Sequence, residues 1–404
     1  MTGPSQSHKA RIRVPVAALL AVGVTFWSLK NSAAPFVWIG VVWAAALIWT
    51  AWVSTRVWIQ AVAVNLAIIL LSLTGFEFYL FWGHRQGETA QHTTVPYVEA
   101  DPILGVAGKS NVMTRVTRTH QGGIDYDVTY RLDAHGLRAT REPSTGPVQG
   151  CMVFFGCSFT FGDGVNDDET LPSQVVEKTG GRYRAVNFGI GGSGAHQVLA
   201  QLESGLVDAK SDCTPTRALY SAIPHHVYRA AGKPPKYNFG PRYVRESDGR
   251  VVRSGQIEDA RGQSLIEQSP LLSQLLKSHI YQQILDWPSV TPADVATYVA
   301  IVQAADQLFR RQFPGASFEV LLWDDVPYGE TALYEQVQEE LRRGGLQVHL
   351  VPEILQGYRE DRSRYQLSSR DRHPNARAYA GLADWVVRDL LKEEMADSTR
   401  LYLP

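Results

Sequence analysis

Three uncharged, apolar stretches occupy the first fifth of the chain and are separated only by Lys30 and Arg56. About 20 apolar residues, at 1.5 Å per residue, span a hydrocarbon core of roughly 30 Å. The second and third stretches reach that length, whereas the first is shorter and contains Pro15. The pattern predicts a transmembrane anchor of about three helices within residues 1–82. The stretches are residues 14–29, 31–55 and 57–76.

Charged residues around these stretches indicate which side of the membrane the rest of the chain occupies. No Asp or Glu precedes Glu77, whereas Lys9, Arg11 and Arg13 precede the first stretch. The positive-inside rule keeps that basic cluster in the cytoplasm, so three crossings place everything after Trp82 outside it. Two crossings would reverse the placement. A cleaved signal peptide is the alternative for the first stretch, although two more apolar runs follow it directly. We expect an extracytoplasmic domain anchored in the inner or plasma membrane.

Residues 83–147 are polar and rich in glycine, which is typical of a linker with a small β element. Within them, residues 124–132 alternate between apolar and polar in the manner of a strand, and Asp133 to Gly136 form a turn signal. We expect a strand pair that packs on the following domain.

From Gly150 onward, short apolar runs alternate with amphipathic stretches of helical period. Parallel strands need crossover connections, so this alternation predicts a parallel sheet covered by helices on both faces. The fold class is therefore α/β, a flavodoxin-like αβα sandwich in residues 148–404, with its functional site at the carboxyl ends of the strands. Expected strands are 151–155, 185–188, 218–223, 318–323 and 348–351. Expected helices are 169–178, 195–206, 292–311, 331–343 and 375–392.

Composition and missing motifs argue against several classes of function. The 404 residues contain 39 Lys and Arg against 40 Asp and Glu, so the chain lacks the basic excess of a nucleic-acid binder. Three cysteines are too few for a disulfide scaffold. Neither a His-Glu-x-x-His nor a Cys-x-x-Cys motif is present, and the glycines of residues 189–194 lack the rest of a nucleotide-binding motif. We expect no metal, no cofactor and no nucleic-acid partner.

The candidate chemistry begins where the first predicted strand of the sandwich ends, in the segment Gly-Cys-Ser-Phe-Thr-Phe-Gly-Asp-Gly of residues 156–164. A serine there, Ser158, is exposed at the sheet edge near a helix N-terminus, where backbone N–H groups favour negative charge. Such a position suits a nucleophile. A serine that only caps the turn is the alternative.

Three separated blocks resemble the SGNH, or GDSL-type, hydrolase superfamily: GCSFTFGDGVNDDETLP, VNFGIGGSGAHQ and SSRDRHPNARAYAGLADWV. The resemblance implies that Ser158 is the nucleophile and that Asp371 and His373 are its triad partners. It also implies that the backbone N–H groups of Ser158 and Gly192 form the oxyanion hole. It covers roughly residues 151–391, and the fold that it implies agrees with the one predicted from periodicity.

A serine needs an adjacent base, and the base needs an orienting group, so these residue types form a coherent set. The resemblance implies a serine esterase that cleaves a carboxylic ester through an acyl-enzyme. Together with a membrane anchor, it suggests an O-acyl or O-acetyl group on an envelope glycan or lipid as the substrate. Transfer of the acyl group to a cell-envelope polysaccharide is the alternative. A catalytically degenerate binding protein is a third.

This sequence departs from the family pattern at three points. Asp371 lies two residues before His373 rather than three, so it could instead cap a helix or form a salt bridge. No Asn follows the third predicted strand, where His225 and His226 stand instead; one of them could donate to the oxyanion, or both could be structural. Cys157 replaces a residue that usually supports the nucleophile loop, so support must come from elsewhere.

The cysteines allow one disulfide. Cys151 and Cys157 lie roughly 20 Å apart along one extended strand at 3.3 Å per residue, which is too far for a bond. Cys151 and Cys213 stand near the starts of strands that could be neighbours, and an oxidising compartment would permit a bond between them. Two buried thiols are the alternative.

Residues 230–290 interrupt the sandwich after its third strand. Residues 243–251 read as a hairpin with an Asp-Gly turn, and residues 270–285 as an amphipathic helix. Insertions after strand ends lie over the site, so this segment is a candidate substrate lid that carries Tyr237, Arg242 and Tyr243. An insertion that only covers apolar surface is the alternative.

Overall fold

The chain divides into two compact units, which we call the helix unit and the sandwich unit. The helix unit comprises Met1–Glu88 and Arg261–Trp287, and the sandwich unit comprises Thr89–Ala260 and Pro288–Pro404. The chain therefore passes between the units three times. The computed structural model describes residues 5–32, 34–86, 89–120, 123–146, 148–233, 239–257, 272–285, 290–326 and 331–392.

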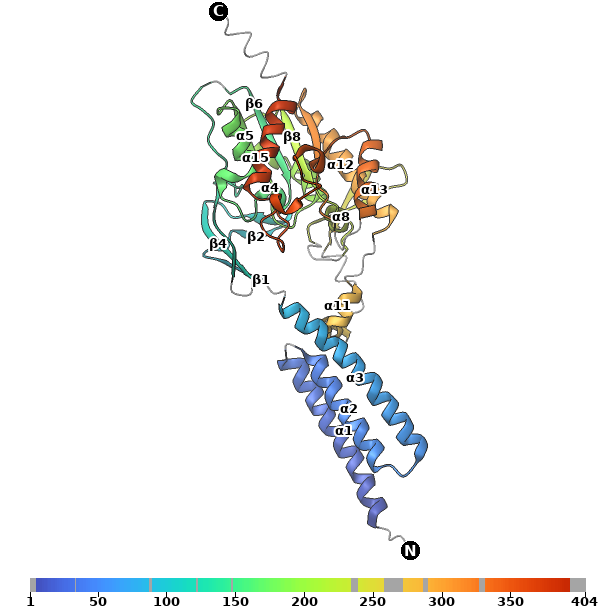
Figure 1. Ribbon diagram of the computed structural model, residues 1–404. Coiled ribbons are helices and arrows are strands. Elements are labelled where there is room, and N and C mark those ends of the chain that lie inside the picture. Colours follow the sequence, from blue (N-terminus) through green and yellow to red (C-terminus); the bar gives the residue numbers. More distant parts are fainter. Residues whose placement is uncertain are drawn as a thin grey trace, which may run out of the picture. The chain divides into compact units, whose positions relative to one another are not determined.

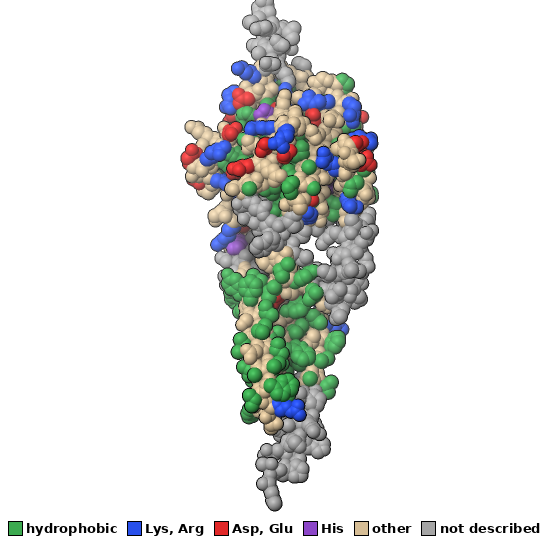
Figure 2. All heavy atoms as spheres, turned by 90° about the vertical axis from the view of Figure 1, so that its right-hand side faces the viewer, with side chains coloured by type: hydrophobic (Ala, Val, Ile, Leu, Met, Phe, Trp, Pro, Cys, Tyr) green, Lys and Arg blue, Asp and Glu red, His purple; other side chains and the backbone are tan. Residues whose placement is uncertain are grey.

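Three long helices begin the helix unit: α1 (Ser5–Asn31), α2 (Pro35–Val53) and α3 (Val57–Gln86). Among the described residues, two segments are long and apolar enough to cross a membrane, Pro35–Val53 and Val57–Gly83. The polar and basic first half of α1 shortens its apolar run, which explains why only two of the three expected spans meet this standard. Hydrophobic side chains cover the visible face of these helices, whereas charged side chains cover that of the sandwich unit (Figure 2).

The sandwich unit contains a five-stranded parallel sheet in the order β12-β11-β8-β6-β7. Numbered 1 to 5 by position in the chain and read from the β7 edge, this order is 2-1-3-4-5, which is the flavodoxin-like arrangement. The predicted α/β fold with a parallel sheet is thus confirmed, and each strand overlaps its predicted range. The strands are β6 (Gly150–Gly156), β7 (Tyr183–Asn187), β8 (Arg217–Ala222), β11 (Ser317–Leu322) and β12 (Gln347–Leu350).

Helices cover both faces of this sheet (Figure 1). Successive strand residues point to opposite faces, so Val153 and Phe155 pack with α6, α12 and α13, whereas Met152 and Phe154 pack with α5, α14 and α15. Buried runs of this kind are expected where both faces of a strand are covered. The helices are α5 (Leu171–Lys178), α6 (Ala195–Glu203), α12 (Pro292–Gln312), α13 (Thr331–Arg343), α14 (Val351–Ile354) and α15 (Ala376–Trp385).

An antiparallel sheet precedes the sandwich, with more strands than the expected pair. Its order is β1-β4-β5, and β2 pairs with β3 beside it. Tyr126, Val128 and Tyr130 of β5 turn inward and pack against Phe161, three residues after the candidate nucleophile. The strands are β1 (Thr89–Thr93), β2 (Val98–Asp101), β3 (Gly105–Gly108), β4 (Val112–His120) and β5 (Gly123–Leu132).

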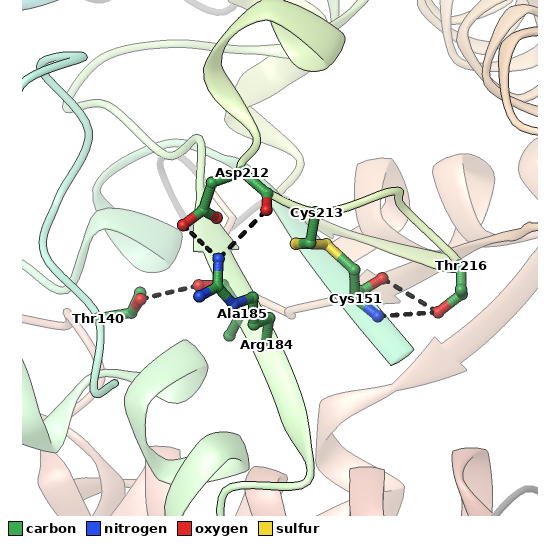
Figure 3. Close-up of a disulfide and its surroundings, with 7 residues drawn as sticks. All are labelled: Thr140, Cys151, Arg184, Ala185, Asp212, Cys213 and Thr216. Carbon is green, nitrogen blue, oxygen red and sulfur yellow. Dashed lines mark hydrogen bonds and ion pairs between the residues drawn. A yellow bond between two sulfur atoms is a disulfide. The ribbon is translucent and has the colours of Figure 1, made fainter. Parts of the chain in front are cut away.

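Cys151 and Cys213 form a disulfide between the start of β6 and the segment before β8 (Figure 3). Their Cα atoms are 6.0 Å apart. Thr216 links the same two segments by hydrogen bonds. Its hydroxyl accepts from the N–H of Cys151 and donates to the carbonyl of Cys151, each at 3.1 Å. Of the two alternatives left by the sequence, the structure has the bonded pair.

The remaining elements connect and extend this core. The predicted hairpin is present as β9 and β10, closed by a turn in which Gly249 has a φ of 88°. These elements are α4 (Ser158–Phe161), α7 (Leu206–Lys210), α8 (His225–Ala230), β9 (Pro241–Arg245), β10 (Val251–Gln256) and α11 (His279–Leu285), with short 3-10 helices at Asp167–Glu169, Leu272–Lys277 and Arg362–Tyr365 and a π-helix at Val386–Leu390.

Candidate active site

Ser158 is the first residue of α4, in a sharp turn at the carboxyl end of β6. Gly156 makes this turn with a φ of 147°, and a Cβ there would lie 2.3 Å from Thr160 Oγ1 and 2.8 Å from the carbonyl oxygen of Ser221. Only glycine fits such a position. The turn ends at Gly162, whose N–H donates to the carbonyl of Ser158 at 2.9 Å. The sequence thus sets the serine at the sheet edge.

The structure brings Ser158, His373 and Asp371 into one chain of hydrogen bonds. His373 Nε2 lies 2.8 Å from Ser158 Oγ, and His373 Nδ1 lies 2.5 Å from Asp371 Oδ1. Since an ionised carboxylate only accepts, we assign the ring proton to Nδ1, which leaves Nε2 free to accept the serine proton. This is the geometry of an activated serine nucleophile.

The shortened spacing between Asp371 and His373 is accommodated by a local turn. Asp371 Oδ1 also accepts the backbone N–H of His373 at 3.1 Å, and the backbone N–H of Asp371 donates to Ser368 Oγ at 3.0 Å. An Asp that bonds the backbone two residues onward is a common turn element. The carboxylate therefore reaches its histidine across a single intervening residue.

The second oxygen of Asp371 accepts a hydrogen bond from the antiparallel sheet. Arg118 Nη1, on β4, donates to Asp371 Oδ2 at 2.7 Å, and the Asp371 side chain is only 2% exposed. The salt-bridge alternative for Asp371 and its triad contact thus occur together. The antiparallel sheet contributes directly to the site.

Burial and charge act in opposite directions on these groups. Burial lowers the pKa of His373, but the hydrogen bond and charge of Asp371 outweigh it, and the pKa lies above its ordinary value. Burial raises the pKa of Asp371, but contacts with His373 and Arg118 outweigh that and lower it. Asp371 is therefore ionised at neutral pH, and its charge favours the protonated form of the His373 ring.

Comparisons with known proteins give structural likeness only. No family model and no curated protein matches the chain. Matching solved structures include a carbohydrate acetylesterase family member from Sinorhizobium meliloti (8% identity, TM-score 0.34) and a variant of an acetylxylan esterase from Geobacillus stearothermophilus (13%, 0.33). Another is an α/β hydrolase enzyme from the metagenome of Lake Arreo, Spain (13%, 0.34). They cover 60%, 62% and 60% of this chain and 97%, 96% and 95% of their own. At these TM-scores the likeness carries no argument about activity, which depends on the geometry of the chain itself.

The candidate oxyanion donors come from the strands on either side of β6. Gly192 follows β7 and has a φ of 82°, and His225 begins α8 after β8. His225 Nε2 has no hydrogen-bond partner among the described residues and lies 3.7 Å from Asp325 Oδ2. Burial, then the charges of Arg229 and Arg372, lower the pKa of His225 to about 3, so its ring is neutral at ordinary pH.

His226 is placed differently from its neighbour. Its ring is fully buried, stacks on Tyr220 and lies with Nδ1 2.5 Å from the Tyr220 hydroxyl. Burial holds its pKa well below the ordinary value. His226 is thus a core residue, and of the two histidines only His225 has a partly exposed side chain.

Support for the nucleophile loop comes from Arg138 and Asn187. Arg138 is 1% exposed, pairs with Asp167 at 2.6 Å and stacks 4.7 Å from the Phe161 ring centre. Asn187 Nδ2 donates to the carbonyl of Thr160 at 3.0 Å. These contacts replace the support that Cys157, a buried free thiol, does not give.

Two side chains beside the triad were not predicted. Arg118 gives no signal in the sequence, because its partner lies 253 residues away. Asp163 lies in the nucleophile block, with Oδ2 3.7 Å from where a Cβ on Gly191 would lie. Burial raises the pKa of Asp163, against the charges of His373 and Arg138. The sequence signal for Asp163 was its position between two glycines in the block that contains Ser158.

The structure bears on the three substrate contacts predicted in the insertion to different degrees. Tyr243 is 3% exposed and donates its hydroxyl to Glu203 at 2.6 Å, so it packs on α6 and offers no surface to a substrate. Arg242 is exposed on β9, and Tyr237 lies outside the described residues. The second half of the insertion belongs to the helix unit.

Among the described residues, no group of three or more His, Cys, Asp or Glu side chains is placed to hold a metal ion. The candidate site as described consists of a serine, a histidine and a carboxylate joined by hydrogen bonds, with candidate N–H donors.

Proposed function

We propose that the chain is a membrane-anchored serine esterase that hydrolyses a carboxylic ester. One observation carries the proposal: the continuous hydrogen bonds from Ser158 through His373 to Asp371 at the carboxyl edge of the sheet. A serine that only capped its turn would not need a half-buried imidazole, oriented by a carboxylate, 2.8 Å from its hydroxyl.

The reaction follows from this geometry. His373 Nε2 takes the proton of Ser158 as Oγ attacks the ester carbonyl, and the tetrahedral oxyanion accepts hydrogen bonds from the N–H groups of Ser158 and Gly192 and from His225. His373 then returns the proton to the leaving alcohol, and the acyl-enzyme remains. Water, deprotonated by His373, releases the acid and restores the serine. Each oxyanion donor stabilises the transition state by roughly 3 to 4 kcal/mol.

The disulfide supports an extracytoplasmic site, because the bond between Cys151 and Cys213 is favoured in an oxidising compartment. This placement requires α1 to cross the membrane together with the two segments that are long and apolar enough among the described residues. We place the sandwich unit outside the cytoplasm, where O-acyl groups on an envelope glycan or a lipid are the ester substrates to test first.

The test is fluorophosphonate labelling of the full chain in detergent, followed by intact mass. We expect one adduct on the wild type and none on Ser158→Ala or His373→Ala. Ser193→Ala, in the nearby glycine-rich loop, is the matched control and keeps the adduct. A folded wild-type protein that takes no label would refute the triad and favour a binding protein.

Substrate assays separate hydrolysis from transfer. We expect release of free acid from O-acetylated glycan or acyl lipid without any added acceptor, and its loss in Ser158→Ala. Acid or acyl product that forms only when a glycan acceptor is added would instead indicate a transferase.

A further inference from the structure

The apolar helix α3 contains a buried carboxylate at Glu77, which is 3% exposed. A carboxylate in apolar surroundings is costly unless hydrogen bonds satisfy it. Glu77 accepts three: from Ser278 Oγ at 2.9 Å, from the N–H of His279 at 2.7 Å and from the N–H of Ile280 at 2.9 Å. The end of α3 therefore depends on the segment that supplies these donors.

That segment, Leu272–Leu285, comes from the insertion after β8 and consists of a 3-10 helix followed by α11. Besides Glu77, it contacts α1 and one further residue of α3. Lys277 Nζ donates to the carbonyl of Leu29 in α1, and the ring of His279 lies 5.4 Å from that of Phe81 in α3. All these contacts lie within the helix unit.

The exposed side chains of the segment include two large apolar ones beside Lys277, Gln282 and Gln283. Leu275 is 37% exposed and Ile284 is 64% exposed, and between residues 272 and 285 the chain has one Lys and no Asp or Glu. The adjoining end of α3 exposes Tyr79 and Trp82 to 69% and 54%. Aromatic residues of this kind collect where a helix leaves the hydrocarbon core, so the exposed apolar positions of the segment continue a lipid-facing surface.

We infer that Leu272–Leu285 lies in the headgroup interface of the membrane that the helices cross, with Leu275 and Ile284 in contact with lipid. Amphipathic segments bind bilayers by burying apolar side chains at the boundary between headgroups and acyl chains. The inference rests on the proposed membrane anchoring and not on the esterase activity. A second copy of the chain fits less well, since the surface is continuous with lipid-facing positions of α3.

This placement gives the insertion a role other than a lid. The chain enters the helix unit at Arg261 and leaves it at Trp287, in addition to the connection at Glu88. Three chain connections therefore join the sandwich unit to the helix unit.

The test uses the full chain in phosphatidylcholine and phosphatidylglycerol vesicles, with an environment-sensitive NBD label on Ile284→Cys. Cys157 is buried and the other two cysteines are bonded, so the background is low. Ile69→Cys in α3 is the membrane reference, and Glu339→Cys in α13 is the water reference. We expect a blue shift and loss of emission with lipid-borne quenchers at positions 284 and 69, but not at 339.

Each other outcome is informative. Quenching at position 69 with water-like emission at 284 would overturn the inference. A blue shift at 284 without lipid quenching would indicate protein contact instead and would also overturn it. Water-like emission at 69 would refute the membrane anchor. Glu77→Ala removes the acceptor and should return the label at 284 to water-like emission, whereas Glu77→Gln keeps an acceptor oxygen and should change it less.

Discussion

At the scale of single residues, Arg118 should influence the candidate base through its contact with Asp371. It bonds the oxygen of Asp371 that does not face His373. It is thus a positioning residue, which fixes the carboxylate and sets the electrostatic environment of the base. It also opposes the imidazolium form, because a positive charge disfavours a second one nearby.

We predict that Arg118→Met lowers kcat roughly 10- to 100-fold with little change in KM, since a hydrogen bond to a charged group contributes about 1.5 to 3 kcal/mol. Arg115→Met is the matched control, because Arg115 lies on the same strand but pairs with Asp127 at the exposed surface. Steady-state kinetics on a chromogenic ester measures both. Equal effects of the two variants would contradict the role given to Arg118.

The pH profile gives an independent check of the same arrangement. His373 must be neutral to act as a base, and its pKa is raised, so kcat/KM should fall as pH drops through a value above the ordinary 6.5. Arg118→Met removes a charge that opposes protonation, so its acid limb should move to higher pH. A limb that stays in place would show that Arg118 has only a structural role.

His225 should contribute to transition-state binding. We predict that His225→Leu lowers kcat roughly 100-fold, the typical loss for one oxyanion donor, with the fluorophosphonate adduct still forming more slowly. His135→Leu, at an exposed turn, is the control. Unchanged kcat in His225→Leu would assign the oxyanion to the backbone N–H groups alone.

The sequence could not separate His225 from His226, because adjacent residues on a short helix point in different directions that only the packing defines. The site blocks identified Ser158, Asp371 and His373, since each follows a strand end or precedes a helix in a recognisable pattern. Arg118 had no such pattern. Its contact depends on how one β element packs on another, which local periodicity does not encode.

At the scale of elements, the disulfide joins the start of β6 to the approach to β8. These strands are neighbours inside the sheet, and the bond closes a separation of 62 residues. In the chain-entropy view, closing such a loop restricts the unfolded state and stabilises the fold by roughly 4 kcal/mol.

We predict that the double variant Cys151→Ser with Cys213→Ser lowers the free energy of unfolding of the sandwich unit by roughly that amount. The urea midpoint for loss of fluorophosphonate labelling measures it, and the wild type with dithiothreitol should match the variant. An unchanged midpoint in both would show that the hydrogen bonds of Thr216 suffice to hold the two strands.

The five parallel strands were predictable because each is a short apolar run buried on both faces. The antiparallel sheet was only partly predictable. Residues 98–108 contain two short strands of four residues each, too short for alternation to appear. Hydrogen bonding to a neighbouring strand, rather than side-chain pattern, defines them.

At the scale of the whole molecule, the insertion is shared between the two units, with β9 and β10 in the sandwich unit and α11 in the helix unit. Its amphipathic pattern was visible in the sequence. Its partner was not, because Glu77 lies 202 residues before His279. Spacing along the chain could suggest a lid but could not reveal that the segment completes a hydrogen-bonded carboxylate in α3.

A fragment consisting of residues 89–404 should therefore behave poorly by itself. We predict that it associates or binds detergent, because the apolar face of Leu272–Leu285 and the donors to Glu77 lose their partners. The same fragment with residues 261–287 replaced by a short Gly-Ser linker should be monodisperse and still take the fluorophosphonate label. Size-exclusion chromatography with light scattering compares them, and equal behaviour without detergent would contradict the shared insertion.

The distance along the chain between Ser158 and His373, 215 residues, also has a consequence in time. The polypeptide is made and folded from its N-terminus, so the helices and the nucleophile turn exist well before the base. A nascent chain therefore carries an unactivated serine, and nucleophilic reactivity appears only when residues 371–373 dock against β4 and α4. On the proposed function, the chain would stay inactive throughout its own synthesis and become active only as the last part of the fold closes.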